Sequence, residues 1–550
     1  MKPDTQALVP KIWQAIWSKE AAVQMDHKIH QSGLVADDTL MELAGYSVAQ
    51  RVLPFLGLDS SIATKILVLT GPGNNGGDGL VAARYLRAAS SEVSCLLVDQ
   101  DLRGKKSSLN QKNLDRARVA GVPMFEDFAD WKKKVAPTYN GLLVIIDAIF
   151  GLGFKGDLSE GHQKLIADLT GFAQKWVCAI DIPSGLEANG AVTSESGVLA
   201  ADLTLTFGAL KPVHVLAPGR HWCGLVETID IGYPCKMEHE VLAEGPIKLR
   251  LRQFHSEQEC TPGPLLHSDI HKYDRGHVLV IGGSVGMSGA PILSALSAYR
   301  GGAGWVSLAL PPACKGEKSV PLDIPLVEGL FRADSTGQPK NPVLDFEALL
   351  EYVEHRSVRS IVLGPGMIEP IASPEFLSFV HDFIQSYQGT VIVDAGALRQ
   401  LGDLLEAGRS FRGRLILLPH PGEWKAMFRT VDCPANLAKG ADAFAEALTW
   451  ASERGLSLLY KSASPIFFNE ELGTADIYRL GSRFLAKAGT GDILAGLIGA
   501  KALEFSQSAV AIDCALAQLH FAALKAAAEL GEDCGMASDL LARLPLGAPC

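Results

Sequence analysis

The chain has 550 residues, which is too long for one hydrophobic core, so two or more domains are expected. Its composition, 47% hydrophobic and 20% charged, is that of a globular protein and excludes disordered and collagenous classes. The net charge of −11 argues against nucleic-acid binding, which needs a basic face. The ten cysteines are scattered and form no Cys-x-x-Cys pair, which predicts reduced thiols. The sequence shows no signal-type segment and no long apolar run, so we expect a cytoplasmic protein with no membrane partner.

Apolar runs alternate with segments of helical period along most of the chain. Strands are expected at 65–70, 142–147, 177–181, 202–207, 277–281, 360–363, 390–394 and 415–418, and helices at 80–89 and 291–301. Because the runs are continuously apolar, they are typical of parallel strands covered on both faces. The pattern predicts a doubly wound α/β fold, formed twice. We place the boundary within 233–276, a stretch rich in charge and histidine that contains Thr261-Pro262-Gly263-Pro264.

The first glycine-rich segment, Gly71–Gly79 (GPGNNGGDG), lies between the strand at 65–70 and a helix. Glycines let the backbone approach a ligand, and N–H groups at a helix N-terminus bind phosphate. The segment also satisfies G-x-G-x-x-G, and Asp99 ends the next strand, so an NAD-dependent oxidoreductase is an alternative. A pyrophosphate-binding turn does not need the side chains of Asn74, Asn75 and Asp78. Their presence favours a chemistry other than hydride transfer.

Two further strands of this half end in polar residues. Asp147 leads into the segment 148–157, and Asp181 leads into Ile182-Pro183-Ser184-Gly185. Ligands of open α/β sheets bind outside the carboxyl ends of the strands, so these segments should meet in one crevice. Oxygen atoms of Asn75, Asp147 and Ser184 would suit a hard cation there. The alternative is that each aspartate only caps a turn.

The segments NNGGDG, DAIFGLGFKGD, DIPSG and ADLTLTFGALKP, with LMELAG at 40–45, closely resemble the NAD(P)H-hydrate epimerase family over residues 20–235. Many members have Asn or Arg where Leu43 stands. The resemblance implies a Rossmann-like three-layer α/β/α domain that interconverts the R and S hydrates, with potassium held by Asn75, Asp147 and Ser184. It implies that the hydrate contacts Asn74, Asn75, Gly76, Gly77, Asp78, Gly151, Leu152, Gly153, Phe154, Lys155, Gly156, Asp157 and Asp181. Asp181 is the expected acid or base, with Lys155 as the second candidate.

The second glycine-rich segment is Ala488–Gly496 (AGTGDILAG). Its backbone N–H groups can stabilise charge that develops on a phosphoryl group, and Asp492 can accept a hydroxyl proton. A plain helix start with an N-terminal aspartate is the alternative. Other polar or glycine-rich turns follow the predicted strands of this half, at 282–284, 364–366, 394–397, 420–423 and 461–465. The chain has no G-x-x-x-x-G-K-[ST] motif, which excludes a P-loop kinase.

The series GGSxxxxGAP, LGPG, VxDAGAL, HPGE and AKAGTGDxLAG resembles the ATP/ADP-dependent NAD(P)H-hydrate dehydratase family, on the ribokinase-like α/β fold, over residues 265–545. Met287 and Met367-Ile368 depart from the usual pattern without removing a polar group. The resemblance implies that the hydrate contacts Ala290, Gly366, His420 and Asp492, and that the adenine nucleotide contacts Lys461, Ser462, Ala463, Ser464, Pro465 and Gly491. It also implies phosphoryl transfer from ADP, accompanied by magnesium, to the 6-hydroxyl and then elimination of phosphate, with Asp492 as the catalytic base.

These resemblances predict a bifunctional enzyme with an epimerase domain at 1–245 and a dehydratase domain at 246–550. Its substrates would be NADHX, NADPHX and ADP, its products NAD(P)H, AMP and phosphate, and family resemblance favours a homo-oligomer. One alternative is a ribokinase-like small-molecule kinase fused to a nucleotide-binding module. An oxidoreductase that uses the first glycine-rich segment leaves the second half unexplained.

Overall fold

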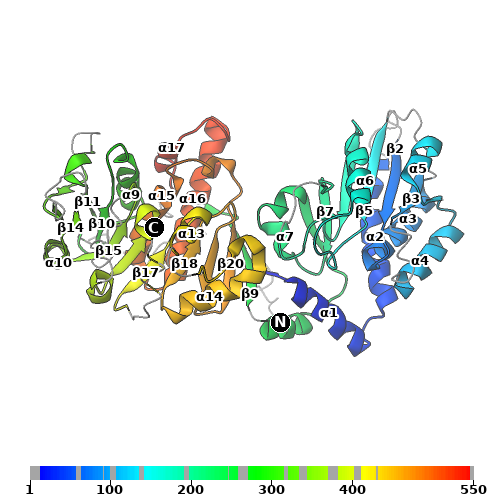
Figure 1. Ribbon diagram of the computed structural model, residues 1–550, viewed down its shortest axis with the longest axis horizontal. Helices are drawn as coiled ribbons and strands as arrows, with labels where there is room; N and C mark the ends of the chain where they lie inside the picture. Colours follow the sequence, from blue (N-terminus) through cyan, green and yellow to red (C-terminus); the bar gives the residue numbers. More distant parts are fainter. Residues whose placement is uncertain are drawn as a thin grey trace, which may run out of the picture. The chain divides into compact units, whose positions relative to one another are not determined.

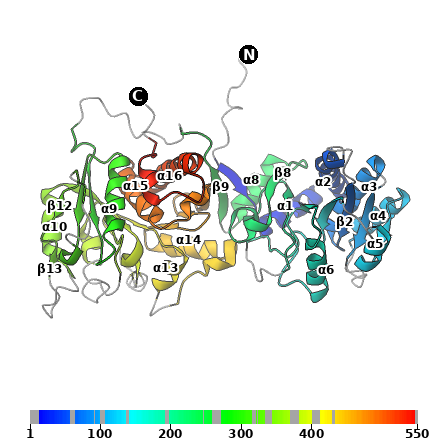
Figure 2. The same cartoon turned by 90° about the horizontal axis from the view of Figure 1, so that it is seen from above.

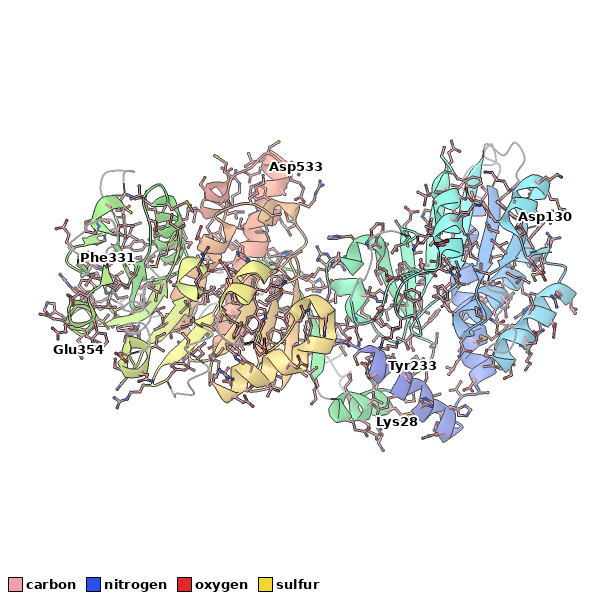
Figure 3. All side chains as sticks on the ribbon, in the orientation of Figure 1. Lys28, Asp130, Tyr233, Phe331, Glu354 and Asp533 are labelled. Atoms are coloured by element: carbon pink, nitrogen blue, oxygen red, sulfur yellow. The ribbon has the colours of Figure 1, made fainter. Side chains whose placement is uncertain are left out.

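The computed structural model describes residues 13–56, 64–90, 92–98, 107–135, 141–190, 197–245, 247–257, 271–314, 320–321, 323–332, 343–368, 382–399, 401, 405, 411–428 and 432–545. Asp99 and Thr261–Pro264 lie outside these residues. The chain forms two compact units (Figure 1). The N-terminal unit comprises 15–249 and 437–443, and the C-terminal unit comprises the described parts of 1–14, 250–436 and 444–550. Each unit is built on its own sheet, with side chains filling the space between sheet and helices (Figure 3).

Within the described residues, the N-terminal unit has a seven-stranded sheet whose paired strands are all parallel. Its order is β4 (Met124–Phe125), β3 (Val93–Leu97), β2 (Thr64–Thr70), β5 (Leu142–Ala148), β6 (Lys175–Ile180), β7 (Leu203–Phe207) and β8 (Leu225–Ile229). Its helices are α1 (Lys19–Ser32), α2 (Asp37–Val52), η2 (Leu53–Leu56), α3 (Asn74–Ala89), α4 (Ser108–Val119), α5 (Phe128–Val135), α6 (Glu160–Thr170), α7 (Pro212–Val215), η4 (Gly219–Trp222) and α8 (Cys235–Glu244).

Both faces of this sheet are covered, which explains the continuously apolar strands. In β2, Ile66 and Val68 pack into one hydrophobic cluster with α2, α3 and α4. Leu67 and Leu69 point to the opposite face and pack with Trp131 of α5 and with α6. Successive residues of a strand face opposite sides, so a strand between two helical layers must be apolar throughout. The predicted three-layer α/β/α architecture of this half is confirmed.

The polar residues of the first glycine-rich segment lie in a helix. We expected one loop over 71–79, but α3 begins at Asn74, so only 71–73 form the turn. The glycines allow close packing: a Cβ on Gly71 would lie 1.9 Å from the Ile149 carbonyl oxygen, and one on Gly76 would lie 2.0 Å from that of Gly71. Because Asn75 and Asp78 are three residues apart in this helix, their side chains lie on the same face of α3.

Within the described residues, the C-terminal unit has an eleven-stranded sheet, and β1 at its edge begins in this unit. Its order is β1 (Trp13–Ile16), β9 (Lys248–Gln253), β20 (Thr474–Arg479), β19 (Ile466–Asn469), β18 (Ser457–Tyr460), β17 (Arg414–Leu417), β16 (Thr390–Val393), β15 (Val358–Leu363), β10 (His277–Ile281), β11 (Trp305–Ala309) and β12 (Leu326–Val327). The strands from β18 to β12 pair in parallel, whereas β18, β19 and β20 pair antiparallel. β13 (Phe331–Arg332) and β14 (Val343–Leu344) form a separate antiparallel pair.

The helices of the C-terminal unit flank this sheet on both sides. They are α9 (Gly289–Arg300), η6 (Pro312–Cys314), α10 (Phe346–His355), η7 (Ala395–Leu398), α13 (Pro421–Ala426), α14 (Phe444–Glu453), η9 (Arg483–Leu485), α15 (Thr490–Glu504), α16 (Ser508–Leu530) and α17 (Ala537–Leu541). Figure 2 shows α9, α15 and α16 together on one face and α14 on the other. The short helix η8 (Leu437–Ala443) belongs to the N-terminal unit.

Two glycine and alanine-rich helices form the core of the C-terminal unit. A Cβ on Gly496 of α15 would lie 2.0 Å from the Ser294 carbonyl oxygen, so this glycine lets α15 and α9 approach closely. Among the described residues, α16 is the one helix long and apolar enough to cross a membrane, but 72% of its most apolar window is buried in the unit. Burial of this kind is typical of a core helix in a globular protein.

Candidate functional site

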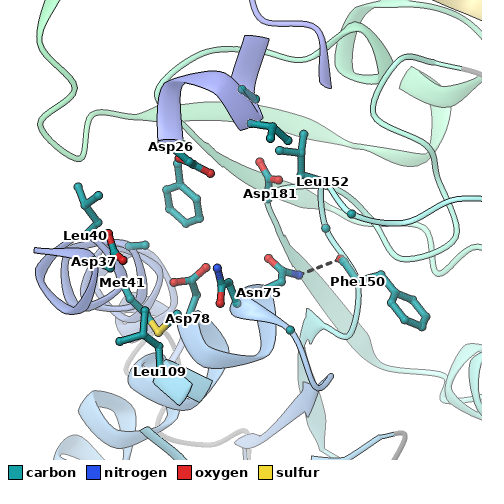
Figure 4. Close-up of a pocket in the computed structure, with 18 of the residues that line it drawn as sticks. Asp26, Asp37, Leu40, Met41, Asn75, Asp78, Leu109, Phe150, Leu152 and Asp181 are labelled. Carbon is teal, nitrogen blue, oxygen red and sulfur yellow. Dashed lines mark hydrogen bonds between the residues drawn. The ribbon is translucent and has the colours of Figure 1, made fainter. Parts of the chain in front are cut away.

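A cavity of about 910 Å³ lies in the N-terminal unit, where β2, β5 and β6 end (Figure 4). Of the residues predicted to contact the hydrate, those that line it are Asn74, Asn75, Asp78, Gly151, Leu152, Gly153, Phe154, Lys155 and Asp181. The others are not among the lining residues: Gly76 and Gly77 are buried in α3, and Gly156 and Asp157 follow in the next turn. The structure therefore brings the three predicted segments together at one crevice.

Asp181 is held in an unusual backbone conformation directly after β6. Its φ of 62° lies in the left-handed region, which residues other than glycine seldom adopt. Its Oδ1 accepts hydrogen bonds from Lys211 Nζ and Thr206 Oγ1, both 2.9 Å away. Burial would raise the pKa of Asp181, but the Lys211 ammonium and the hydrogen bonds outweigh it and lower the pKa below its ordinary value. Asp181 is therefore ionised at neutral pH.

A buried histidine fixes the backbone on both sides of this ion pair. His214 Nε2 lies 2.9 Å from the Asp181 carbonyl oxygen, and the Lys211 backbone N–H donates to His214 Nδ1 at 3.0 Å. These partners require a neutral ring with its proton on Nε2. Burial lowers the pKa of His214 to about 4, with the charge of Lys211 acting in the same direction. The ring therefore positions Asp181 and stays uncharged at neutral pH.

Asp78, on the first turns of α3, has the opposite electrostatic environment. Its carboxyl group projects into the cavity shared with Asp181 (Figure 4). Burial raises the pKa of Asp78 well above its ordinary value, and the negative charges of Asp181 and Asp26 raise it further. The cavity therefore pairs a carboxylate whose pKa is lowered with a carboxyl group whose pKa is raised, an arrangement suited to proton transfer.

A third carboxyl group enters the same cavity from α1. Asp26 Oδ1 accepts a hydrogen bond of 2.8 Å from the Tyr233 hydroxyl, which follows β8. Enclosure in the cavity raises the pKa of Asp26, while the bond from Tyr233 opposes that shift. Neither residue was among the predicted site residues, because neither belongs to a glycine-rich or strand-end motif. Lys211 does lie within the quoted ADLTLTFGALKP segment, and its pairing with Asp181 is visible only in the fold.

Asp147 and Ser184 are hydrogen-bonded to each other at this cavity, and Asn75 and Ser184 both contact the Phe150 backbone. Ser184 Oγ donates to Asp147 Oδ1 at 2.6 Å, the Ser184 N–H donates to Oδ2 at 2.8 Å, and Asn75 Nδ2 donates to the Phe150 carbonyl oxygen at 2.8 Å. Asp147 is fully buried inside β5, and burial raises its pKa although Ser184 opposes the shift. Within the described residues, no lysine or arginine is ion-paired with this carboxylate. A buried carboxylate beside hydroxyl, amide and carbonyl oxygens fits a hard monovalent cation.

In the C-terminal unit, the predicted site residues follow the carboxyl ends of neighbouring strands. Gly366 follows β15, His420 follows β17, Lys461 follows β18, and Asp492 lies in the first turn of α15. A Cβ on Gly366 would lie 2.3 Å from the Met287 carbonyl oxygen and 3.3 Å from Ala290 Cβ, so these two predicted hydrate contacts are neighbours. The nearest side-chain atom to a Cβ on Gly491 would be Lys461 Nζ, at 3.6 Å, so the two predicted nucleotide contacts also lie together.

An ammonium group surrounded by carboxylates forms the centre of this site. Lys461 Nζ is hydrogen-bonded to Asp394 Oδ1 and lies 3.7 Å from Glu423 Oε2. Burial raises the pKa of Asp492 to about 7, and the charges of Asp394 and Glu423 add to the shift while Lys461 opposes it. Asp394 and Glu423 lay in the quoted motifs but were not predicted as site residues. A carboxylate that titrates near neutrality is suited to accept a proton.

His420 caps the helix that it precedes. Its Nδ1 accepts from the backbone N–H groups of Gly422 at 2.9 Å and Glu423 at 3.2 Å, which leaves the proton on Nε2. The side chain is 53% exposed, so the ring is both fixed and accessible. In the turn after β18, Ser462 Oγ donates to the Ser464 carbonyl oxygen at 2.5 Å, which stabilises the segment of Ala463 and Pro465.

Comparisons with known proteins match both halves. The family described as YjeF-related protein N-terminus matches residues 37–213, and the NAD(P)H-hydrate dehydratase family matches residues 278–544. The bifunctional NAD(P)H-hydrate repair enzyme of Moorella thermoacetica is 31% identical over 530 residues, which cover 95% of this chain and 94% of that protein. The chain belongs to the family of bifunctional NAD(P)H-hydrate repair enzymes.

Another family member, from Pyrobaculum aerophilum, is 30% identical and covers 92% of this chain and 93% of its own. Among solved structures, one match is the ADP/ATP-dependent NAD(P)H-hydrate dehydratase from Bacillus subtilis, co-crystallised with ATP/Mg2+. It is 23% identical in sequence, has a TM-score of 0.40, and covers 53% of this chain and 95% of that chain. The predicted family, its two-domain α/β fold and its pairing of an epimerase with a dehydratase are confirmed. The kinase and oxidoreductase alternatives gain no support from these matches.

Proposed function

We propose that the cavity of the N-terminal unit epimerises the R and S hydrates of NADH and NADPH, with Asp78 and Asp181 exchanging protons with the hydrate. The observation that carries this proposal is that two carboxyl groups face one cavity and that their pKa values are shifted in opposite directions. Inverting the hydrated carbon requires one group that gives a proton and one that takes a proton. Lys155 lines the same cavity, and we assign it to substrate contact. The role of base goes to Asp181, because Asp181 is ionised and Lys211 holds it in place.

The carbon that inverts carries both a hydroxyl group and the ring nitrogen. Asp78 gives its proton to the hydroxyl, the carbon–oxygen bond breaks and water leaves, and the lone pair of the ring nitrogen forms the new bond to carbon. Water then adds to the opposite face, and Asp181 accepts the proton that this water loses. One carbon–oxygen bond is broken and one is formed, and nothing is oxidised or reduced. In the reverse direction the two carboxyl groups exchange roles.

Asn75, Asp147 and Ser184 would hold a potassium ion in this unit. The ion would supply positive charge beside the buried Asp147 carboxylate, which has no cationic side chain against it among the described residues. Ser184 and Asp147 join the segment after β6 to β5, and Asn75 joins α3 to the Phe150 backbone. Through these bonds the three residues would fix the segments that carry Asp181 and Asp78.

The C-terminal unit would dehydrate the S hydrate at the expense of ADP. Asp492 removes the proton of the 6-hydroxyl, whose oxygen attacks the β-phosphorus of ADP and releases AMP. Loss of phosphate from that carbon and of a proton from the neighbouring ring carbon then forms the double bond and restores NAD(P)H. Backbone N–H groups at the start of α15 face the transferred phosphoryl group. Lys461 to Pro465 and Gly491 would contact the nucleotide, which magnesium accompanies, and Ala290, Gly366 and His420 would contact the hydrate. A homo-oligomer is expected from family resemblance alone.

The test adds purified protein to hydrated NADH with ADP and follows absorbance near 340 nm, while chromatography separates the two epimers. The wild type should restore the absorbance of both epimers. Asp492→Asn should abolish recovery but still interconvert the epimers, whereas Asp181→Asn should recover only the S epimer. Loss of both activities in either variant would contradict the assignment of one reaction to each unit. Stable phosphorylated hydrate without recovery would instead favour the kinase alternative.

A further inference from the structure

The epimerisation proposed above uses two carboxyl groups, but the cavity contains a third. Asp26 extends from α1, on the side of the cavity away from β6, and its carboxyl group projects into the space that Asp78 and Asp181 face (Figure 4). The Tyr233 hydroxyl fixes it with a bond of 2.8 Å. A tyrosine that donates to a carboxylate holds its position without neutralising its charge. Asp26 is therefore a carboxyl group with a fixed position that the two proton transfers leave unused.

The charges around the cavity leave Asp26 without a cationic partner among the described residues. Lys211 is bound to Asp181, and Asp37 pairs with His30 at 2.7 Å. The charges of Lys211 and His27 lower the pKa of Asp26, but neither group forms a salt bridge with it among the described residues. Lys155, on the segment after β5, is exposed and has no ion pair with Asp26. Of the three carboxyl groups in the cavity, Asp26 is therefore the one that neither pairs with a lysine nor exchanges a proton in the proposed reaction.

The substrate develops a charge of the opposite sign. When the carbon–oxygen bond breaks, the ring nitrogen shares its lone pair with the neighbouring carbon, and the ring becomes a cation. A bound ring excludes water from the cavity, and attraction between the cation and a fixed carboxylate strengthens as the dielectric falls.

We propose that Asp26, fixed by Tyr233, is a catalytic residue of the epimerase that stabilises the cationic nicotinamide ring formed during epimerisation. This inference rests on the function proposed for this cavity. It assigns the ligand preference of the cavity as well: a planar ring with positive charge on its nitrogen should bind better than the same ring without charge. NAD+ and NADH form such a pair, because they differ at the nicotinamide ring and share the rest of the molecule.

The experiment compares Asp26→Asn and Tyr233→Phe with the wild type in the full chain. Asp26→Asn should lower kcat for epimer interconversion about 100-fold and change the KM for the hydrate less than threefold, because the charge acts only after bond breaking. Tyr233→Phe should lower kcat about tenfold, since the carboxylate remains but is no longer fixed. Asp130→Asn, at an exposed position of α5 (Figure 3), is the matched control and should leave kcat unchanged. Circular dichroism and thermal unfolding of the N-terminal unit, which carries all three substitutions, report whether each variant is folded.

Binding by calorimetry gives a second readout that needs no turnover. The wild type should bind NAD+ more tightly than NADH at this cavity, and Asp26→Asn should reduce NAD+ affinity at least tenfold while leaving NADH affinity unchanged. The C-terminal unit is identical in both proteins, so the difference between them reports on this cavity. Unchanged kcat in Asp26→Asn, or a loss carried by KM with equal effects on NAD+ and NADH, overturns the inference. A wild type that does not interconvert the epimers overturns the proposed function instead.

Discussion

Aspartates at the two sites differ in charge because their neighbours differ. Lys211 lowers the pKa of Asp181, whereas burial and the neighbouring carboxylates raise the pKa of Asp78. Asp492 lies between these cases, with Lys461 opposing the effects of burial, Asp394 and Glu423. Aspartate can thus serve as a base at one position and as an acid at another, because the surroundings set its pKa. Proteins perform both acid and base catalysis near neutral pH in this way.

Dehydration should depend on the ionisation of Asp492. Its pKa is raised to about 7, and a base acts only when ionised, so kcat/KM for dehydration should rise with pH through about 7 and level off above it. Glu423→Gln removes a nearby negative charge and should move this limb to lower pH by roughly half a unit. Rates of absorbance recovery across pH values, at fixed ionic strength, measure both curves. A limb that stays in place in Glu423→Gln would show that another group controls it.

Breaking the buried ion pair of the epimerase should harm both stability and catalysis. Lys211→Met leaves the Asp181 carboxylate buried without its cation, and such losses lower the free energy of unfolding by about 3–5 kcal/mol. The pKa of Asp181 should rise at the same time, so epimer interconversion at neutral pH should fall more than 100-fold. Denaturant unfolding and epimer chromatography test the two effects. The double variant with Asp181→Asn should regain stability but not activity.

The helices of the N-terminal unit position their residues through close contacts at glycine. A Cβ on Gly45 of α2 would lie 2.5 Å from Val81 Cβ and 2.6 Å from the Asp78 carbonyl oxygen. This glycine therefore lets α2 lie directly against the part of α3 that carries Asp78. The motif LMELAG thus has a packing function as well as a place in the family pattern.

Gly45→Ala should separate the two helices and displace Asp78. Overpacking of this kind lowers the free energy of unfolding by about 1–3 kcal/mol, and epimerisation should fall with it. Gly161→Ala on α6 is the matched control, because a Cβ there would meet only Ser159 Oγ at 3.7 Å. The control should gain a few tenths of a kcal/mol from its higher helix propensity. Equal losses in both variants would argue against the contact as the cause.

Strands and strand-end residues could be predicted from the sequence because both follow from local pattern. The expected strands at 277–281 and 142–147 differ from the observed β10 and β5 by at most one residue. The asparagines after Gly73 were placed in a loop, because glycines that serve helix packing look like glycines of a loop. The stretch 233–276, in which we placed the domain boundary without expecting a helix or strand, contains α8 and β9. Asp26 and Tyr233 could not be predicted, since their proximity depends on how α1 and the chain after β8 meet across the sheet.

At the scale of the whole molecule, the sheet of the C-terminal unit is completed by the other end of the chain. β1 lies beside β9 at the edge of this sheet. Trp13 contacts Tyr478 edge to face with ring centres 5.8 Å apart, and the Arg250 guanidinium lies 4.3 Å from the centre of the Trp13 ring. Sequence patterns describe neighbours along the chain, so a strand that joins a distant sheet is invisible to them.

Trp13→Ala should therefore destabilise the dehydratase. Loss of the aromatic and cation–π contacts should lower the free energy of unfolding of this unit by about 1–2 kcal/mol. That corresponds to a fall of roughly 2–8 °C in its melting temperature. Thermal inactivation of ADP-dependent recovery measures the change. Leu472→Ala, at an exposed turn of the same unit, is the control and should leave the inactivation temperature within about 1 °C.

The position of β1 also has a consequence for how the protein is made and divided. The ribosome synthesises this strand first, yet its partner β9 emerges only after the strands of the first sheet have been translated. A protease cut, or a gene split, placed between the two catalytic halves would leave β1 on the epimerase fragment, where Ile16 also pairs with Leu210. The other fragment would then expose β9 as an open sheet edge, where unpaired backbone groups invite association with other chains. Separate epimerase and dehydratase polypeptides cut from this chain would therefore need a new way to cover that edge.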